Sequence, residues 1–394
     1  MKKICVLLLA FLSGTALYSQ PMSEAETKAM ALANDGKLAE AASAFEAIYN
    51  ADNKNTKALY TLTELYEDLG ELQKAYPLAS KGASLNPDVE DWAFLKAEIE
   101  LKLGNNDAVI QTANNFLAKH SDAAFIYFIK AKALDAQSKI QLAIGAYSKA
   151  IANKPGYVNA LYLRAKDFVA ISRYQNGVDD FSKVIELAPK NDEVYNQRGL
   201  AYYSLKQMNE AYADFSKAIE YNPKNKYAYA NRGWVNFNNG NDANALADFE
   251  NSNAIKNYAD AYYGLASVYK KQKQYSLAIE NIQKAISLDD KMPAYFAIYS
   301  SVLAASSRND EALTAAEKIL TLDANSPDGF ILKATALSNL EKYEEAVKTI
   351  TMGIQQYSDN YLMYGLRSFI YKQQGKTSLA EADNQKAKEL STKE

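Results

Sequence analysis

A period of 34 residues is the feature of this sequence that most constrains its fold. The repeated units span residues 22–55, 56–89, 90–123, 124–157, 158–191, 192–225, 226–258, 259–292, 293–326, 327–360 and 361–394. Only the seventh of these eleven units is one residue short. Such a period identifies a solenoid, because one unit cannot bury its own apolar face and must stack on copies of itself.

Two positions of the unit carry small residues along the chain. Position 8 is occupied by Ala29, Thr63, Ala97, Ala131, Ala165, Gly199, Gly233, Ala266, Ser300, Ala334 and Ser368. Position 20 is equally small apart from Val109, and position 24 carries an aromatic ring in five units: Phe45, Tyr147, Phe181, Phe215 and Phe249. Small residues among larger apolar ones at helical spacing predict two helices that cross closely, with the ring filling the groove beside the crossing.

Glycine and proline predict where these helices end. Glycine recurs near positions 15–17, at Gly36, Gly70, Gly104, Gly240 and Gly375. Proline follows the second helix at position 32, at Pro87, Pro155, Pro189 and Pro223, or opens the next unit, at Pro293 and Pro327. Glycine breaks a helix, whereas proline cannot continue one but suits the start of the next, so each unit is predicted to be a helix–turn–helix.

These residues resemble the tetratricopeptide repeat. The family pattern has an aromatic residue at position 4, Leu-Gly at 7 and 8, Tyr at 11, Ala at 20, Phe at 24 and Pro at 32. The unit at 192–225 matches it best, with Tyr195, Gly199, Tyr202, Ala211, Phe215 and Pro223. We therefore predict an all-α fold: a right-handed superhelical α-solenoid of 22 helices that forms a single array over residues 22–394.

The first nineteen residues are predicted to be a cleaved signal peptide. Lys2 and Lys3 precede an apolar run from Ile4 to Leu12, which is too short to span a bilayer and is followed by small and polar residues. Cleavage after Ala16 and cleavage just before Gln20 both fit. Because Cys5 lies at the head of the apolar run, a lipoprotein anchor is disfavoured, and we expect an exported, periplasmic or secreted protein without a transmembrane segment.

Charge and cysteine content exclude several classes of function. Removal of the signal peptide leaves 42 basic against 47 acidic residues, a net charge of −5, with the two signs interspersed. The basic footprint of a nucleic-acid binder is therefore missing. Removal also takes away the single cysteine, which excludes disulfides, thiolate metal sites and cysteine nucleophiles in the mature chain.

Few residues suit catalysis. The single histidine, His120, is predicted to lie near a helix end and to contact its last carbonyl groups. The pairs Asp179-Asp180 and Glu344-Glu345 are adjacent in helices, where neighbouring side chains diverge by about 100°, and are predicted to lie on solvated faces. We expect no catalytic residue, no cofactor and no metal, and predict that the protein is not an enzyme.

The resemblance implies that the first helix of each unit lines a concave face, chiefly through positions 2, 5, 9, 12 and 13, and that extended peptides or partner segments bind there. Aromatic residues occupy many of these slots: Tyr60, Phe94, Phe125, Phe128, Tyr162, Tyr203, Tyr227, Trp234, Phe237, Tyr263 and Phe369. Lysines and asparagines are interleaved with them: Lys132, Lys166, Asn196, Asn238, Lys270 and Lys271. The Lys and Asn pattern by which some members of the family clamp a terminal carboxylate is not reproduced.

Two functions fit this composition. The first is a protein-interaction scaffold that binds a peptide or partner protein through Tyr162, Lys166, Asn196, Tyr203, Tyr227, Trp234, Phe237, Tyr263 and Lys270. Rigid aromatic surface with scattered amides and cations is typical of binding hot spots. The alternative is a glycan-binding module of the cell envelope in which the same rings stack on sugars. Each aromatic residue could instead pack against a neighbouring helix, but positions 4, 11 and 24 already supply the core of each unit.

Overall fold

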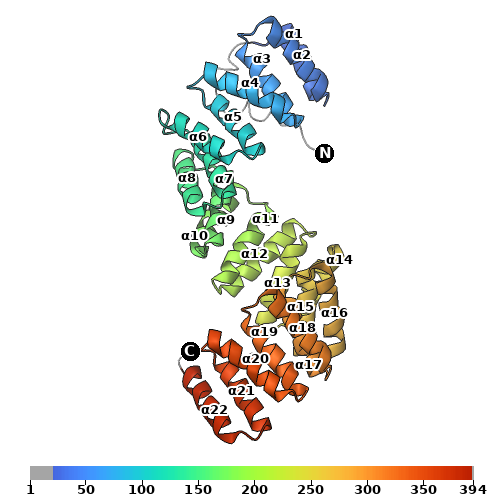
Figure 1. Ribbon diagram of the computed structural model, residues 1–394. Coiled ribbons are helices and arrows are strands. Elements are labelled where there is room, and N and C mark those ends of the chain that lie inside the picture. Colours follow the sequence, from blue (N-terminus) through green and yellow to red (C-terminus); the bar gives the residue numbers. More distant parts are fainter. Residues whose placement is uncertain (1–20, 393–394) are drawn as a thin grey trace. The chain divides into compact units, whose positions relative to one another are not determined.

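A computed structural model describes residues 21–392, and within them the chain forms 22 helices joined by short turns (Figure 1). The predicted signal peptide lies outside the described residues. Helices that follow one another in the sequence pack against each other within residues 24–187 and within residues 192–391. The predicted all-α solenoid of helix–turn–helix units is thereby confirmed.

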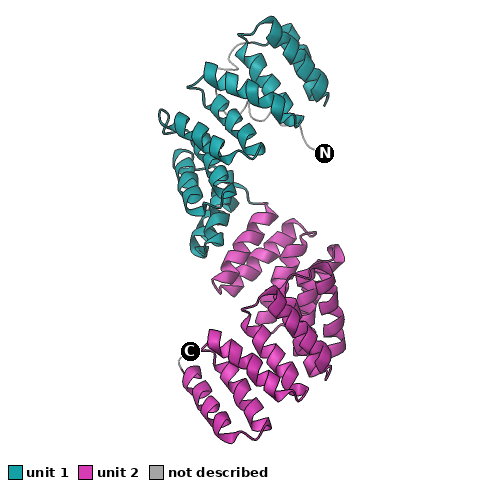
Figure 2. Cartoon of the chain, in the orientation of Figure 1, with its two compact units in different colours: residues 1–189 teal, residues 190–394 magenta. Residues whose placement is uncertain are grey.

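The helices divide into two compact units, residues 1–189 and residues 190–394 (Figure 2). Unit 1 contains α1 (Glu24–Asn34), α2 (Leu38–Ala51), α3 (Thr56–Asp68), α4 (Leu72–Leu85), α5 (Glu90–Lys102), α6 (Asn106–Leu117), α7 (Ala124–Ala136), α8 (Ile140–Asn153), α9 (Val158–Ala170) and α10 (Tyr174–Leu187). Unit 2 contains α11 (Asp192–Ser204), α12 (Met208–Tyr221), α13 (Lys226–Asn238), α14 (Asp242–Ile255), α15 (Ala259–Lys271), α16 (Tyr275–Leu288), α17 (Pro293–Ala305), α18 (Asn309–Leu322), α19 (Pro327–Asn339), α20 (Tyr343–Gln356), α21 (Tyr361–Gln373) and α22 (Thr377–Ser391). The single array over residues 22–394 stays a prediction.

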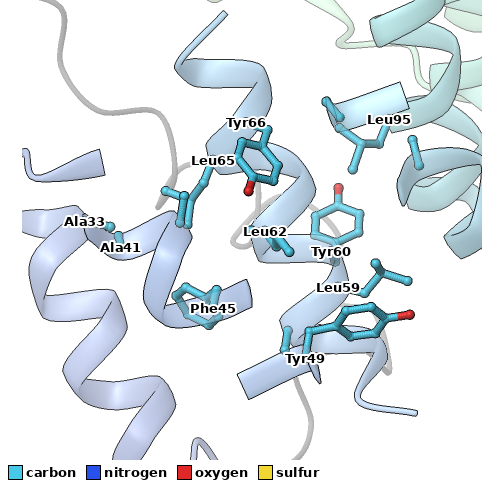
Figure 3. Packing of buried hydrophobic residues seen from close by; sticks show 14 of the residues in the cluster. Ala33, Ala41, Phe45, Tyr49, Leu59, Tyr60, Leu62, Leu65, Tyr66 and Leu95 are labelled. Atoms are coloured by element: carbon cyan, nitrogen blue, oxygen red, sulfur yellow. The ribbon is translucent and has the colours of Figure 1, made fainter. Parts of the chain in front are cut away.

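The small residues at positions 8 and 20 lie at the crossings of the paired helices. Ala29 and Ala41, for example, are 1% and 0% exposed, and the rings at position 24 are buried beside them, with Phe45 at 1% and Phe215 at 0%. Figure 3 shows Phe45 with Leu59, Leu62 and Leu65 in the first core cluster. Each repeat thus contributes its small residues and its ring to the core of the helices around it.

Two glycines at position 8 lie directly against the ring at position 24. A Cβ atom on Gly199 would lie 2.7 Å from the Phe215 ring, and one on Gly233 would lie 2.8 Å from the Phe249 ring. These distances are shorter than ordinary van der Waals contact. The ring and the glycine therefore form one packing unit.

Position 15 of every sequence unit has a positive φ angle. Gly36, Gly70, Gly104, Gly240 and Gly375 have φ between 71° and 79°. The remaining six units place a side chain there, at Ser138, Ser172, Lys206, Lys273, Ser307 and Glu341, with φ between 58° and 62°. The turn geometry is therefore imposed by the helix pair, whether or not glycine is present to relieve it.

Four buried ion pairs also fasten helices together, and the sequence analysis missed them. Arginine at position 7 binds aspartate at position 23 through two parallel N–H groups: Arg164 with Asp180, Arg198 with Asp214, Arg232 with Asp248, and Arg367 with Asp383, at 2.7–3.0 Å. A third N–H of Arg164 reaches Ser148 of the preceding sequence unit, at 2.8 Å. One guanidinium group thereby joins three helices.

This arrangement corrects the prediction for Asp180. Its side chain is 3% exposed and paired with Arg164, whereas Asp179, the next residue, is exposed. Adjacent residues on a helix face different directions, and one of the two faces the core. The predicted solvated face holds for Asp179 and for Glu344 and Glu345 but is wrong for Asp180.

Candidate functional site

In unit 2, aromatic side chains of the first helices gather around Trp234 of α13. Its ring centroid lies 5.7 Å from that of Phe237, 5.1 Å from that of Tyr263 on α15, and 5.2 Å from that of the buried Phe249 on α14. A hollow of about 270 Å³ opens beside it, lined by Leu200, Tyr203, Phe215, Asn231, Trp234 and Tyr263. We call these six residues, together with Phe237, the Trp234 surface.

Three of the predicted binding residues line the hollow and remain partly exposed. Tyr203, Trp234 and Tyr263 line the hollow, each with an intermediate exposure. The Tyr203 hydroxyl oxygen accepts a hydrogen bond of 2.6 Å from the Asn238 amide, so its ring is held in place. Rigid rings of this kind provide contact area at a small cost in conformational entropy.

Phe237 and Lys270 lie at the ends of the same helices. The ammonium group of Lys271 lies 5.4 Å from the centre of the Phe237 ring and is paired with Asp242 at 2.7 Å. Lys270 is partly buried, and this burial lowers the pKa of its ammonium group.

The structure places Asn196 and Tyr227 elsewhere. Asn196 is only 4% exposed and accepts a hydrogen bond of 2.9 Å from Asn231, so it supports the hollow from behind. Tyr227 is 48% exposed but packs edge-on against Tyr258 and does not line the hollow. Sequence position alone therefore did not separate supporting residues from surface residues.

The remaining two predicted residues, Tyr162 and Lys166, belong to α9 of unit 1. The Tyr162 ring lies 5.9 Å from the buried Phe181 ring, and the Lys166 ammonium group lies 5.8 Å from the centre of the Tyr162 ring. Tyr162 is thus anchored on its own core, with Lys166 covering it.

Unit 1 contains a larger pocket that the sequence analysis did not single out. It has a volume of about 470 Å³ and is lined by Tyr60, Glu64, Glu67, Glu90, Asp91, Phe94, Leu95, Glu98, Phe125, Phe128, Lys132, Lys154, Gly156, Tyr157, Val158 and Asn159. We call it the acidic pocket. Its aromatic wall is continuous: Phe125 lies 6.1 Å from Phe94 and 5.4 Å from Tyr157, and Tyr157 lies 4.8 Å from Phe128.

Other carboxylates of the acidic pocket have partners within the protein. Glu67 is paired with Lys102 at 2.7 Å, and Glu98 lies 4.0 Å from the same ammonium group. Glu90 accepts a hydrogen bond of 2.9 Å from the backbone N–H of Phe125. Burial raises the pKa of Glu67 to about 7 in spite of Lys102, and it also raises the pKa of Glu90.

Glu64 is different. Its side chain is only 9% exposed, and no hydrogen bond or ion pair from residues 21–392 reaches its carboxyl group. Burial, followed by the charges of Glu67, Asp68 and Asp91, raises the pKa of Glu64 to about 8. An ionisable group without a partner is costly to bury, so this carboxyl group is poised to be neutralised by a proton or by a cation.

A signal for the acidic pocket was present in the sequence. Glu64 and Glu98 occupy position 9 of the second and third units, Glu67 occupies position 12, and Asp91 occupies position 2, which are slots of the predicted concave face. The predicted binding surface was built from the aromatic residues, lysines and asparagines at these slots and did not include the carboxylates.

His120 differs from its predicted role. It follows the end of α6, and its Nε2 atom lies 3.1 Å from a carboxylate oxygen of Asp88, while its ring stacks on Phe116 at 4.5 Å. Its partner is therefore a side chain rather than the helix carbonyls.

Within residues 21–392, no three histidine, cysteine, aspartate or glutamate side chains are arranged to hold a metal ion. None of the helices in that range combines the length and hydropathy that a bilayer span requires.

Sequence models of the tetratricopeptide repeat match residues 32–99, 94–158, 193–225 and 259–292. None of the curated proteins matches the chain. Among solved structures, the Cut9–Hcn1 hetero-tetramer of the APC/C is similar at 14% identity and a TM-score of 0.47, covering 95% of both chains. Yeast Tom70 is similar at 15% identity and a TM-score of 0.46, covering 93% of this chain and 91% of its own.

YrrB, described as a tetratricopeptide repeat protein with an unusual peptide-binding site, has 24% identity and a TM-score of 0.39 over 46% of this chain and 95% of its own. The matched residues contain the same small, aromatic and turn positions that build the helix pairs of both units. The chain therefore belongs to the tetratricopeptide repeat family, whose repeats indicate a protein–protein interaction scaffold.

Proposed function

We propose that this protein is an exported, non-catalytic scaffold that binds a peptide or a segment of a partner protein on the Trp234 surface. The observation that supports this proposal is the cluster of partly exposed rings around Trp234, which rests on the buried ring of Phe249. Aromatic anchors in a preformed hollow, with a few hydrogen-bonding groups beside them, are the usual centre of a protein interface.

The polar groups of the surface suit an extended polypeptide. The Asn231 amide lies in the wall of the hollow and is oriented by its bond to Asn196, and the Tyr203 hydroxyl is oriented by Asn238. Amide and hydroxyl groups held in this way can pair with backbone N–H and C=O groups of a ligand while the rings take its side chains.

The test is capture of partners from an envelope extract by the purified protein, with the double variant Trp234→Ala and Phe237→Ala. We expect at least a tenfold loss of the captured partner, because truncation of a central aromatic anchor costs about 2 kcal/mol or more. The matched control is Tyr212→Ala, which removes an exposed ring of α12 outside the hollow. Equal recovery with the double variant would reject the Trp234 surface.

Glycan binding by the same rings is separated by fluorescence. Oligosaccharides that stack on Trp234 would change its emission in the wild type and not in Trp234→Phe. If the proposal holds, a partner peptide changes the emission and oligosaccharides do not.

Export is tested separately by N-terminal sequencing of the mature protein, which should begin after residue 16 or residue 19.

A further inference from the structure

The acidic pocket of unit 1 has a composition that suits one class of ligand. It lies among the first helices α3, α5 and α7, with the start of α9 at one side. Five carboxylates and two lysines line it, so negative charge predominates. The rings of Phe94, Phe125, Phe128 and Tyr157 form its aromatic wall.

The wall already holds an ammonium group. Lys154 places its Nζ atom 4.4 Å from the centre of the Phe125 ring and 5.2 Å from that of Tyr157. Lys132 approaches Phe128 in the same way, at 5.7 Å. The negative faces of aromatic rings attract cations at such distances, and the effect grows when water is excluded. The same wall therefore has the electronic character that a further cation requires.

The opposite side offers an unpartnered carboxyl group. Glu67 and Glu90 have partners inside the protein, whereas Glu64 is nine-tenths buried, lines the pocket and has no hydrogen-bond or ion-pair partner within residues 21–392. A buried carboxyl group of this kind is best satisfied by a charged donor that enters the pocket.

We propose that the acidic pocket binds a cationic side chain, lysine or arginine, of a partner polypeptide, with the charge held between Glu64 and the aromatic wall. The apolar stem of such a side chain suits Phe94 and Leu95. The site is separate from the Trp234 surface, and it depends on the proposed function only in that a polypeptide carries the cation.

The probe is a fluorescein-labelled glycine–serine octapeptide with two adjacent lysines, and its neutral counterpart has norleucine at both places. Fluorescence anisotropy at pH 7.5 and physiological ionic strength should show binding of the lysine peptide only. Glu64→Gln should weaken this binding at least tenfold. Glu186→Gln, which removes an exposed carboxylate of α10 outside the pocket, should leave it unchanged.

Proton release on peptide binding is a second measurement, and it would not change if Glu64 had only a structural role. The Glu64 carboxyl group faces Glu67 and Asp68 on its own helix and Asp91 and Glu98 on α5, and it is largely protonated at neutral pH because of its raised pKa. An entering cation stabilises the carboxylate, so titration calorimetry in two buffers of different ionisation enthalpy should detect a released proton. The proton should be absent in Glu64→Gln.

The outcomes are distinguishable. Equal binding of the norleucine peptide would show an apolar groove and overturn the proposal, as would equal losses in Glu64→Gln and Glu186→Gln, which would show non-specific attraction to an acidic protein. Should Glu64→Gln fold poorly by circular dichroism, Glu98→Gln in the same pocket takes its place: it removes a neighbouring negative charge, so it should weaken the lysine peptide while the proton from Glu64 is still released, and unchanged binding would overturn the proposal. The Trp234→Ala and Phe237→Ala variant should retain the lysine peptide, so failure of the proposed function and failure of this inference give different results.

Discussion

The acidic pocket of unit 1 and the Trp234 surface of unit 2 use the same positions of the repeat for different chemistry. In both, residues at positions 5, 9 and 12 of first helices face an open space. In unit 1 the rings share these slots with carboxylates, and in unit 2 they share the neighbouring space with amides and hydroxyl groups. The repeat thus fixes where these side chains lie, and single substitutions decide the chemistry of the space that they line.

The two regions also differ in how they relate to stability. The Trp234 surface rests on a fully buried ring, so its shape is part of the core. The acidic pocket contains a carboxyl group whose burial opposes folding when it is ionised. Truncation in one region and neutralisation in the other should therefore change stability in opposite directions.

The largest expected effect is that of Phe249→Ala. The ring is 0% exposed and contacts Trp234, Gly233 and Gly264, so its loss should lower the free energy of unfolding by about 3–5 kcal/mol, as measured by urea denaturation. Because repeats couple mainly to their neighbours, amide hydrogen exchange should accelerate in α13–α16 and remain unchanged in α3–α7. Equal acceleration of exchange in both regions would show that the stability of α3–α7 depends on the packing around Phe249.

The second effect has the opposite sign and depends on pH. The folded-state pKa of Glu64, about 8, exceeds its ordinary value of 4.5, so the folded state binds the extra proton between these values. The contribution of Glu64 to the free energy of unfolding is fully present below pH 4.5 and is lost as the pH rises through 8. Glu64→Gln should therefore raise the free energy of unfolding at pH 8.5 by about 2–4 kcal/mol and change it little at pH 4.5.

The control for this prediction is Glu186→Gln, whose exposed carboxylate should leave the pH profile as in the wild type. Parallel profiles for the wild type and Glu64→Gln would show that Glu64 is ionised without cost in the folded protein.

The smallest effect should be the same in both units. Ser172 of unit 1 and Lys206 of unit 2 occupy position 15 with φ of 60° and 62°, where a side chain is strained. Replacement of either by glycine should raise the thermal midpoint modestly, corresponding to about 0.5–1 kcal/mol after the greater unfolded-state freedom of glycine is subtracted. A gain in one unit and a loss in the other would indicate that the turns are not equivalent.

Much of the fold was predictable because the core positions carry the same residue types in each 34-residue repeat. The predicted helix crossing at Ala211 and the ring of Phe215 are fully buried, and Pro293 and Pro327 open helices as expected. Asp180 was not predictable from its own neighbourhood, since its partner Arg164 lies sixteen residues away. Comparison of positions 7 and 23 across units would have revealed the pair.

The candidate site was predictable only in part. Of the predicted binding residues, Trp234 and Tyr263 line the hollow, whereas Asn196 is buried behind it, and binding by them stays a prediction. The size of the side chains on the adjacent helix decides whether a residue at a concave position is exposed or covered. The residue type at that one position carries no information about those neighbours.

By itself, the sequence determined the helix pairs, their turns and the close helix crossings. Close packing requires the same residue types at the same positions every 34 residues, so these positions can be recognised in the sequence. Only the tertiary structure decided which free slots combine into a pocket and which carboxylate lacks a partner. Those properties arise between side chains far apart in the chain, such as Glu64, Phe94 and Tyr157, whose shared surroundings set the burial and charge that each experiences.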